Sequence, residues 1–204
     1  AYFERIGQVS AQKRVSRHSD TPQIDTPHSR RRISMSDFEW ADLIDQQDRV
    51  RTLIDPTSQY ALAAAYAMGR SMDDEIISAV SGNAFGGETG STTIALPSAQ
   101  KITESGTAGL TIAKLRSAKE IMDSNSIDPS IPRTLVVSPK QITDLLGTTE
   151  VTSSDFNTVK ALSNGEVNQF MGFNFIVSNR LTSSSSKRLC LAFTNDAIKL
   201  ALGK

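Results

Sequence analysis

Residues 56–81 read PTSQYALAAAYAMGRSMDDEIISAVS, and they carry the strongest structural signal in this chain of 204 residues. The stretch is rich in strong helix formers, and an apolar stripe continues at spacings of three and four as far as Val80. Asp55 is a good N-cap, Pro56 suits the first helical position, and Gly82 ends the pattern. The sequence therefore predicts one helix over 56–81, about 39 Å long at 1.5 Å per residue.

Residues 1–36, before that helix, have the pattern of an extended β-hairpin rather than of a packed layer. Strand-like segments at residues 2–6 and 9–15 precede a polar stretch that contains Pro22 and Pro27. A lone two-stranded ribbon is marginally stable in water. We therefore expect this arm to need a partner surface to become ordered.

Residues 37–54 combine apolar side chains with four Asp and one Glu. Phe38, Trp40 and Leu43 are predicted to anchor a short acidic helix or turn onto a core, with the carboxylates facing water or a basic neighbour. After the long helix, the small and glycine-rich residues 83–93 predict a flexible loop.

Residues 94–202 predict a compact mixture of short strands and helices. We expect strands at 94–96, 101–102, 134–137, 170–177 and 189–193, helices at 111–124, 140–146 and 156–163, a low-complexity loop at 183–186, and a helical or strand-like segment at 196–202. The chain as a whole predicts an α+β fold, with an arm, one long helix and a compact mixed domain.

The formal charge is zero, with 22 Lys and Arg against 22 Asp and Glu, which argues against a generally basic nucleic-acid binder. The charges are nevertheless segregated along the chain. Residues 1–36 hold seven basic and three acidic residues, residues 37–90 hold three and ten, and residues 91–204 hold twelve and nine. Such asymmetry bears on association rather than on fold.

The segregation suggests a contact between copies of the chain, in which the basic hairpin docks on the acidic segment of an adjacent copy. The residues of this hypothesis are Lys13, Arg14, Arg17, Arg30, Arg31, Arg32, Asp37, Glu39, Asp42, Asp45 and Asp48. If it holds, charge reversal at 30–32 impairs association and reversal in the acidic segment partly rescues it. The alternative is a nucleic-acid-binding module that uses the basic arm, residues 13–32, with salt-sensitive binding.

The sequence offers little for catalysis, and we expect no enzyme activity, no metal site and no cofactor. Its two histidines, His18 and His28, lie in the polar arm, and the single cysteine excludes an internal disulfide. Cys190 alternates with leucines, as a small core or edge residue does. The acidic residues 73–75 read as a solvated helix face, and the glycines of residues 86–90 lack the Lys-Ser/Thr ending of a phosphate loop. No apolar run reaches the roughly 20 residues of a membrane helix.

The order of the segments resembles the major capsid proteins of tailed bacteriophages, which share the Hong-Kong-97-type fold. Three stretches carry the resemblance: residues 45–82, which contain DPTSQY and IISAVSG; residues 132–139, PRTLVVSP, followed by a helix; and residues 170–179, FMGFNFIVSN, followed by residues 189–193. Together they span most of residues 38–202. Each stretch is moderately specific, and their order and spacing strengthen the match.

The resemblance implies a virion shell subunit that assembles into pentamers and hexamers around the phage genome and is made in the host cytoplasm. Residues 1–36 would be the E-loop arm, residues 37–100 the peripheral domain with its spine helix at 56–81, and residues 101–204 the axial domain. The implied partners are copies of the chain, packaged DNA at the inner surface, and portal, scaffolding or decoration proteins, with no membrane. Both ends are shorter than the family pattern, so we expect a reduced member or a segment of a longer chain.

Overall fold

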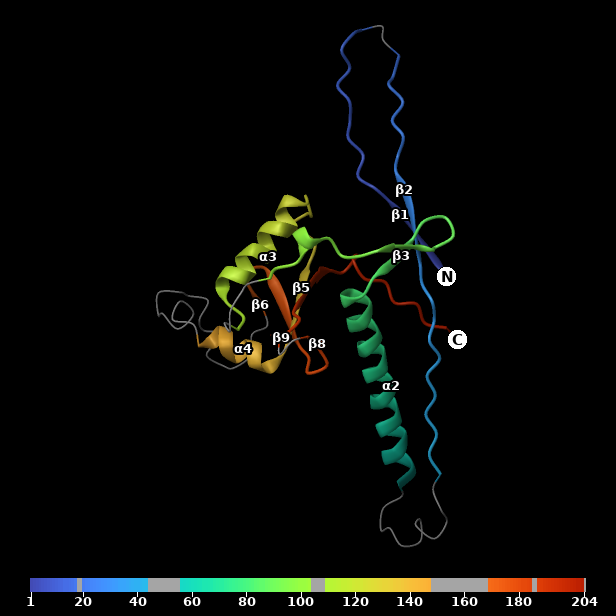
Figure 1. Cartoon of the computed structure of the whole chain (residues 1–204), viewed down its shortest axis with the longest axis vertical. Helices are drawn as coiled ribbons and strands as arrows, with labels where there is room; N and C mark the ends of the chain where they lie inside the picture. The colour runs from blue at the N-terminus through green and yellow to red at the C-terminus, as the bar shows by residue number, and fades with distance from the viewer. Residues whose placement is uncertain (18–19, 44–55, 104–108, 148–168, 185–186, 204) are drawn as a thin grey trace. The chain divides into compact units, whose positions relative to one another are not determined.

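The computed structural model describes the chain except for residues 18–19, 44–55, 104–108, 148–168, 185–186 and 204 (Figure 1). The chain divides into two compact units. The first unit comprises Ala1–Ser36, Gly82–Leu96 and Ala201–Lys204, and the second comprises Asp37–Ser81 and Pro97–Leu200. Helices and strands are mixed in the chain, as the sequence predicts.

The first unit is built on a four-stranded antiparallel sheet with the order β1-β2-β3-β4. Its strands are β1 (Tyr2–Ile6), β2 (His28–Arg32), β3 (Ala84–Gly86) and β4 (Thr92–Ile94). The strand predicted at 9–15 is absent, and the loop predicted at 83–93 is wrong. That segment forms a β3–β4 hairpin that hydrogen-bonds to the free edge of β2, so its backbone groups are satisfied by pairing rather than by water.

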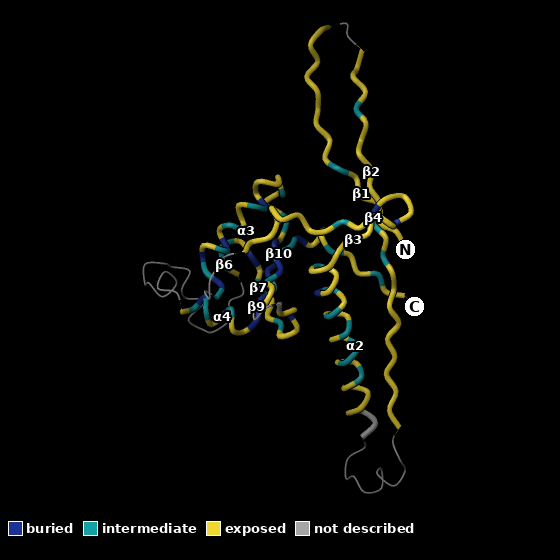
Figure 2. The backbone as a smooth tube through the Cα atoms, in the orientation of Figure 1, coloured by how far each residue is buried: buried dark blue, intermediate teal, exposed yellow. Residues whose placement is uncertain are grey.

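The second unit contains α2 (Pro56–Ser81), which confirms the predicted helix and its bounds. The N-cap predicted at position 55 lies outside the described residues. Near the C-terminal end of α2, Ile77 is buried against Leu181 and Leu191. Most of the helix before Asp74 is exposed or half-buried (Figure 2).

The sheet of the second unit has the order β10-β5-β7-β6. Its strands are β10 (Leu191–Thr194), β5 (Arg133–Val137), β7 (Phe173–Val177) and β6 (Gln169–Phe170). β5 and β7 are parallel and the outer pairs are antiparallel.

Successive side chains of β5 point to opposite faces of this sheet, so the strand contributes to the packing on both faces. Leu135 and Val137 join the main core with side chains from β7 and from helices α3 (Ile112–Ser124) and α4 (Pro139–Leu146), and Val136 packs with the cluster at the end of α2. The buried residues of the main core are Leu110, Ile112, Leu115, Met122, Leu135, Val137, Ile142, Leu145 and Phe173.

Local signals set the ends of α3 and α4. The Thr111 hydroxyl accepts a hydrogen bond from the Lys114 backbone N–H at 3.4 Å, and so caps α3. At α4, the Ser138 backbone N–H donates to the Gln141 side-chain oxygen at 2.8 Å, with Pro139 at the first helical position. The helices predicted at 111–124 and 140–146 are confirmed within one residue at their starts.

The single strand predicted over 170–177 is wrong, because the segment is a hairpin of β6 and β7. Met171 and Gly172 form its two-residue turn, with φ values of 53° and 84°. Positive φ at both central residues is the geometry that matches the right-handed twist of paired strands. Gly172 supplies this conformation without steric cost.

Other expectations in this region also differ from the structure. The loop predicted at 183–186 is wrong at its start, since β8 (Ser183–Ser184) pairs with β9 (Lys187–Arg188), and residues 185–186 lie outside the described residues. No strand forms at 101–102, and residues 198–203 have no regular secondary structure. Residues 37–43 likewise have none, and the predicted anchor is wrong there, because Phe38, Trp40 and Leu43 are 45%, 44% and 99% exposed. The helix predicted at 156–163 lies outside the described residues.

Candidate interaction surfaces

Two of the three consecutive arginines at the end of β2, Arg30 and Arg32, have partners within their own sheet. Arg30 Nη2 donates to Glu4 Oε1 at 2.9 Å, and its guanidinium lies 5.4 Å from the centroid of the Tyr2 ring. The Arg32 guanidinium lies 5.1 Å from the centroid of the Phe85 ring, within the range of a cation–π contact. These side chains therefore link β1, β2 and β3.

Arg31 points to the opposite face of the same sheet and is half-buried. Its Nη1 lies so close to Gly86 that an added Cβ would be 2.6 Å from it. A Cβ at this position would also lie 2.7 Å from Ile94 Cδ1, so a larger residue at 86 requires the ends of the Arg31 and Ile94 side chains to shift. The phosphate loop considered for residues 86–90 is instead the β3–β4 connection.

The arm between β1 and β2 carries the other basic residues. Gly7 N–H donates to Pro27 O at 2.8 Å and extends the strand pairing beyond β1, and residues 8–17 and 20–27 have almost no regular structure. Lys13 and Arg17 are exposed, and Arg14 donates to the backbone oxygens of Ser16 and Arg17. Val15, at 97% exposure, shows how little this arm buries on its own.

The acidic segment of the sequence is described only in part. Asp37, Glu39 and Asp42 are exposed in residues 37–43, whereas the predicted contact residues Asp45 and Asp48 lie outside the described residues. The first described residues of the second unit therefore carry three exposed carboxylates that a basic partner can reach.

The N-terminal part of α2 presents an uncharged surface. Residues 59–69 contain no Asp, Glu, Lys or Arg, and Tyr60, Leu62 and Tyr66 are exposed. A groove of about 470 Å³ lies along residues 65–76 of the helix, and its lining includes the apolar Tyr66 and Met72 together with the charged Arg70 and Asp73. A helix that is apolar on all sides is normally buried. We therefore expect another protein surface to cover residues 59–69.

The C-terminal part of α2 is anchored by an ion pair that the sequence pattern did not reveal. Arg180, in the loop after β7, donates from Nε to Asp74 Oδ1 at 2.5 Å and from Nη2 to Asp74 Oδ2. This pairing lowers the pKa of Asp74, with the hydrogen bonds from Arg180 as the largest cause. Asp74 therefore differs from the solvated helix face expected for residues 73–75.

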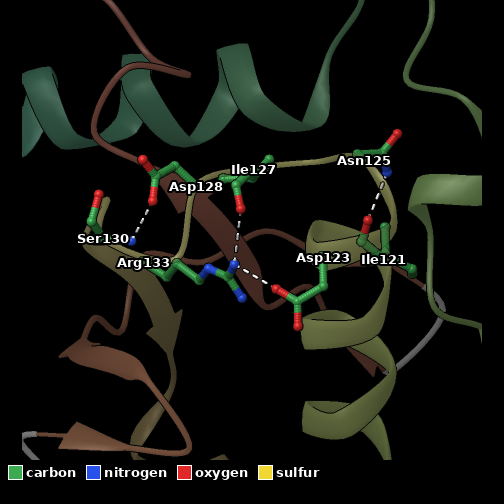
Figure 3. Close-up of polar contacts among 7 residues, drawn as sticks. All are labelled: Ile121, Asp123, Asn125, Ile127, Asp128, Ser130 and Arg133. Atoms are coloured by element: carbon green, nitrogen blue, oxygen red, sulfur yellow. Dashed lines mark hydrogen bonds and ion pairs between the residues drawn. The ribbon is translucent and has the colours of Figure 1, made fainter.

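A second ion pair stabilises the end of α3 (Figure 3). Arg133 is buried at the start of β5, and its Nη2 donates to Asp123 Oδ1 at 2.6 Å and to Ile127 O at 3.4 Å. Its Nε is buried and has no partner among the described residues. A carboxylate near a helix C-terminus is unfavourable with the helix dipole, and the guanidinium offsets it.

The described residues offer little for metal binding or for a reactive thiol. No group of three or more His, Cys, Asp or Glu among them is arranged to hold a metal ion. Burial raises the pKa of the Cys190 thiol to about 11, which disfavours the thiolate. No helix in the described part of the chain is both long and apolar enough to cross a membrane.

Comparison with known proteins gives a family match over the whole chain. A family model described as phage capsid protein matches residues 1–204. No curated protein matches the chain.

Solved structures with similar folds come from phages. The capsid structure of the cyanophage P-SCSP1u aligns with a TM-score of 0.59 at 20% identity, covering 95% of this chain and 67% of that chain. A chain from Mycobacterium phage Che8 aligns with a TM-score of 0.52 at 18% identity, covering 91% and 64%. The mature capsid of bacteriophage PhiM1 gives 0.57 at 17% identity, covering 91% and 60%. The chain therefore spans about two thirds of the length of these structures, and at such identities the likeness shows the fold alone.

Proposed function

Because the chain belongs to the phage capsid protein family, we propose that it is a major capsid protein that self-assembles into the pentamers and hexamers of an icosahedral shell. In this proposal the shell encloses the phage genome, and the protein acts by binding copies of itself rather than by catalysis. Many modest contacts in a closed array suffice for such a shell.

The observation that carries the proposal is the apolar surface of α2. Residues 59–69 form an uncharged helix surface, with Leu62 50% exposed and Tyr66 60% exposed. Complete burial of an exposed apolar side chain stabilises by about 1.5–3 kcal/mol. Because these side chains are about half exposed, a cover supplied by neighbouring copies would gain part of that amount from each. The described residues of the arm, 7–17 and 20–27, bury little, which gives a second reason to expect a neighbouring surface.

We assign the parts of the chain to the Hong-Kong-97-type plan as follows. Residues 1–36 serve as the E-loop arm over a neighbouring copy, residues 37–100 with α2 as spine helix form the peripheral domain, and residues 101–204 form the axial domain. The protein is made in the host cytoplasm and resides in the virion, where the inner surface meets packaged DNA without sequence preference. Portal, scaffolding and decoration proteins are the further partners of this plan.

Charge complementarity supports one contact between copies. The exposed Lys13 and Arg17, together with Arg14, dock on the acidic segment of the adjacent copy, where Asp37, Glu39 and Asp42 are exposed. Such pairing at an exposed surface contributes mainly to specificity and to the rate of encounter, and it weakens with salt.

Electron microscopy of the expressed full chain, together with mass measurement, tests the proposal. We expect closed particles from the wild type and loss of particles in Tyr66→Lys, because a lysine places charge in the surface to be covered. Ser78→Lys is the matched control, since Ser78 is an exposed position of the same helix. A wild-type chain that stays monomeric at high concentration and binds DNA in a salt-sensitive way would overturn the proposal in favour of the nucleic-acid-binding alternative.

A further inference from the structure

We propose that Arg30 and Arg32 form an intramolecular clasp that fixes the base of the arm, residues 7–27, on the β3–β4 hairpin. They are positioning residues for assembly, and they do not contact the neighbouring copy. The role in assembly rests on the proposed function, whereas the clasp itself rests on contacts inside the first unit.

Arg32 occupies the central position of the clasp. The strand register places it opposite Tyr2 on β1 and opposite Phe85 on β3. Its guanidinium lies 5.1 Å from the centroid of the Phe85 ring. A cation over an aromatic face is attracted by the ring quadrupole, and this contact joins the arm strands to the second hairpin.

The loop between β3 and β4 covers the stem of Arg32. Gly90 has a φ of 66°, and a Cβ added there would lie 2.7 Å from Arg32 Cβ and 2.9 Å from its Cδ. On the same side, the Tyr2 hydroxyl donates to Thr89 O at 3.3 Å. Arg32 is thus flanked by the Phe85 ring and by the glycine of the loop, with Tyr2 tied to the same loop.

Arg30 adds the link to β1. It pairs with Glu4 directly across the strands at 2.9 Å and lies over the Tyr2 ring. Opposite charges at directly paired positions stabilise a sheet, and like charges there destabilise it. A two-stranded ribbon is marginal on its own, and these side-chain contacts add to the backbone pairing of β2 with β3 that extends the ribbon.

The clasp changes which basic residues are available to a partner. Arg30 and Arg32 have their charges engaged within the first unit, so the basic side chains that remain for a neighbour are those farther along the arm, such as Lys13 and Arg17. We therefore divide the basic residues of the arm into two groups: Arg30 and Arg32, which hold its base, and residues farther along the arm, such as Lys13 and Arg17, which face a partner.

Amide hydrogen exchange of the unassembled full chain tests the clasp independently of assembly. We expect Arg32→Met and Phe85→Leu to speed exchange in residues 28–33 by about fivefold, the factor that corresponds to a loss of about 1 kcal/mol. The matched controls are Arg17→Met in the same arm and Phe38→Leu, which has an exposure close to that of Phe85; both leave this exchange unchanged. Unchanged exchange in both clasp variants would overturn the proposal.

A charge swap separates the clasp from a contact with the neighbouring copy. Arg30→Glu alone faces Glu4 with a like charge, and we expect faster exchange and fewer particles. Adding Glu4→Arg restores both, because the pair re-forms within the sheet. Rescue by Asp37→Lys with Glu39→Lys, and not by Glu4→Arg, would contradict the clasp. If the wild type forms no particles, the proposed function fails, and the exchange measurements still decide the clasp.

Discussion

Replacing Asp123 by Asn tests how the buried guanidinium of Arg133 is held. The change removes the negative charge 2.6 Å from Arg133 Nη2 but keeps an oxygen that can accept the hydrogen bond. Removing one partner of a fully buried pair costs roughly 3–5 kcal/mol. The Asp123 side chain is 47% exposed, so water screens part of this interaction, and we expect a loss of about 2 kcal/mol in the free energy of unfolding.

Arg133→Met gives the contrasting result. It removes the buried charge together with its unpartnered Nε, and a methionine fills similar space, so we expect a loss below about 1 kcal/mol. Thermal unfolding of the unassembled chain followed by circular dichroism measures both. The midpoint should fall by about 4–8 °C for Asp123→Asn, at about 2–4 °C per kcal/mol for a chain of this size.

The control for this comparison is Glu120→Gln, the same carboxylate-to-amide change at an exposed position of α3. We expect it to stay within about 0.5 kcal/mol of the wild type. If Arg133→Met destabilises more than Asp123→Asn, then packing of the arginine stem outweighs its charge, and the reasoning is refuted.

Two further predictions concern titrating groups. At pH 8, Cys190 in the folded chain should react with iodoacetamide roughly 200-fold more slowly than an ordinary thiol, because burial raises its pKa to about 11, and equal rates with and without urea would contradict this. The pKa of Asp74 is lowered from 3.8 in the folded chain, so the stability difference between wild type and Asp74→Asn should be present above about pH 5 and disappear as the pH falls through the folded-state pKa. Urea unfolding at several pH values measures it, and a difference that grows toward low pH would show that the sign is wrong.

Local signals in the sequence predicted the helices well. The bounds of α2 follow from Pro56, from a run of helix formers and from Gly82, all within one segment. The starts of α3 and α4 follow in the same way from Thr111 and from Ser138-Pro139. Such features depend on neighbouring residues, so the sequence alone is enough to locate them.

Features that depend on pairing between distant segments were missed. Residues 84–94 have the composition of a loop, and only the free edge of β2 makes them strands. The Asp74–Arg180 pair joins positions 106 residues apart, and no spacing rule links them. The β6–β7 turn, in contrast, could have been predicted. Gly172 lies between two phenylalanine-containing segments, and such a glycine is a hairpin signal.

The candidate contact residues show the same limit. Their charges indicated that the arm is basic and that a later segment is acidic, which remains the basis of the proposed pairing between copies. The sequence could not show that Arg30 and Arg32 face Glu4 and Phe85, because that depends on the strand register.

The distribution of buried residues explains why a subunit of this kind should depend on its neighbours. Nearly all the buried apolar side chains belong to the second unit, where β5 and β7 are covered by α3 and α4. The arm and the uncharged part of α2 bury little, although together they contain some of the chain's largest exposed apolar side chains. A chain that folds one compact core and leaves such segments exposed gains further apolar burial only through association. If the proposed function holds, the buried core of the second unit supplies the stability of the folded chain, while the arm and residues 59–69 of α2 contribute to the free energy of assembly.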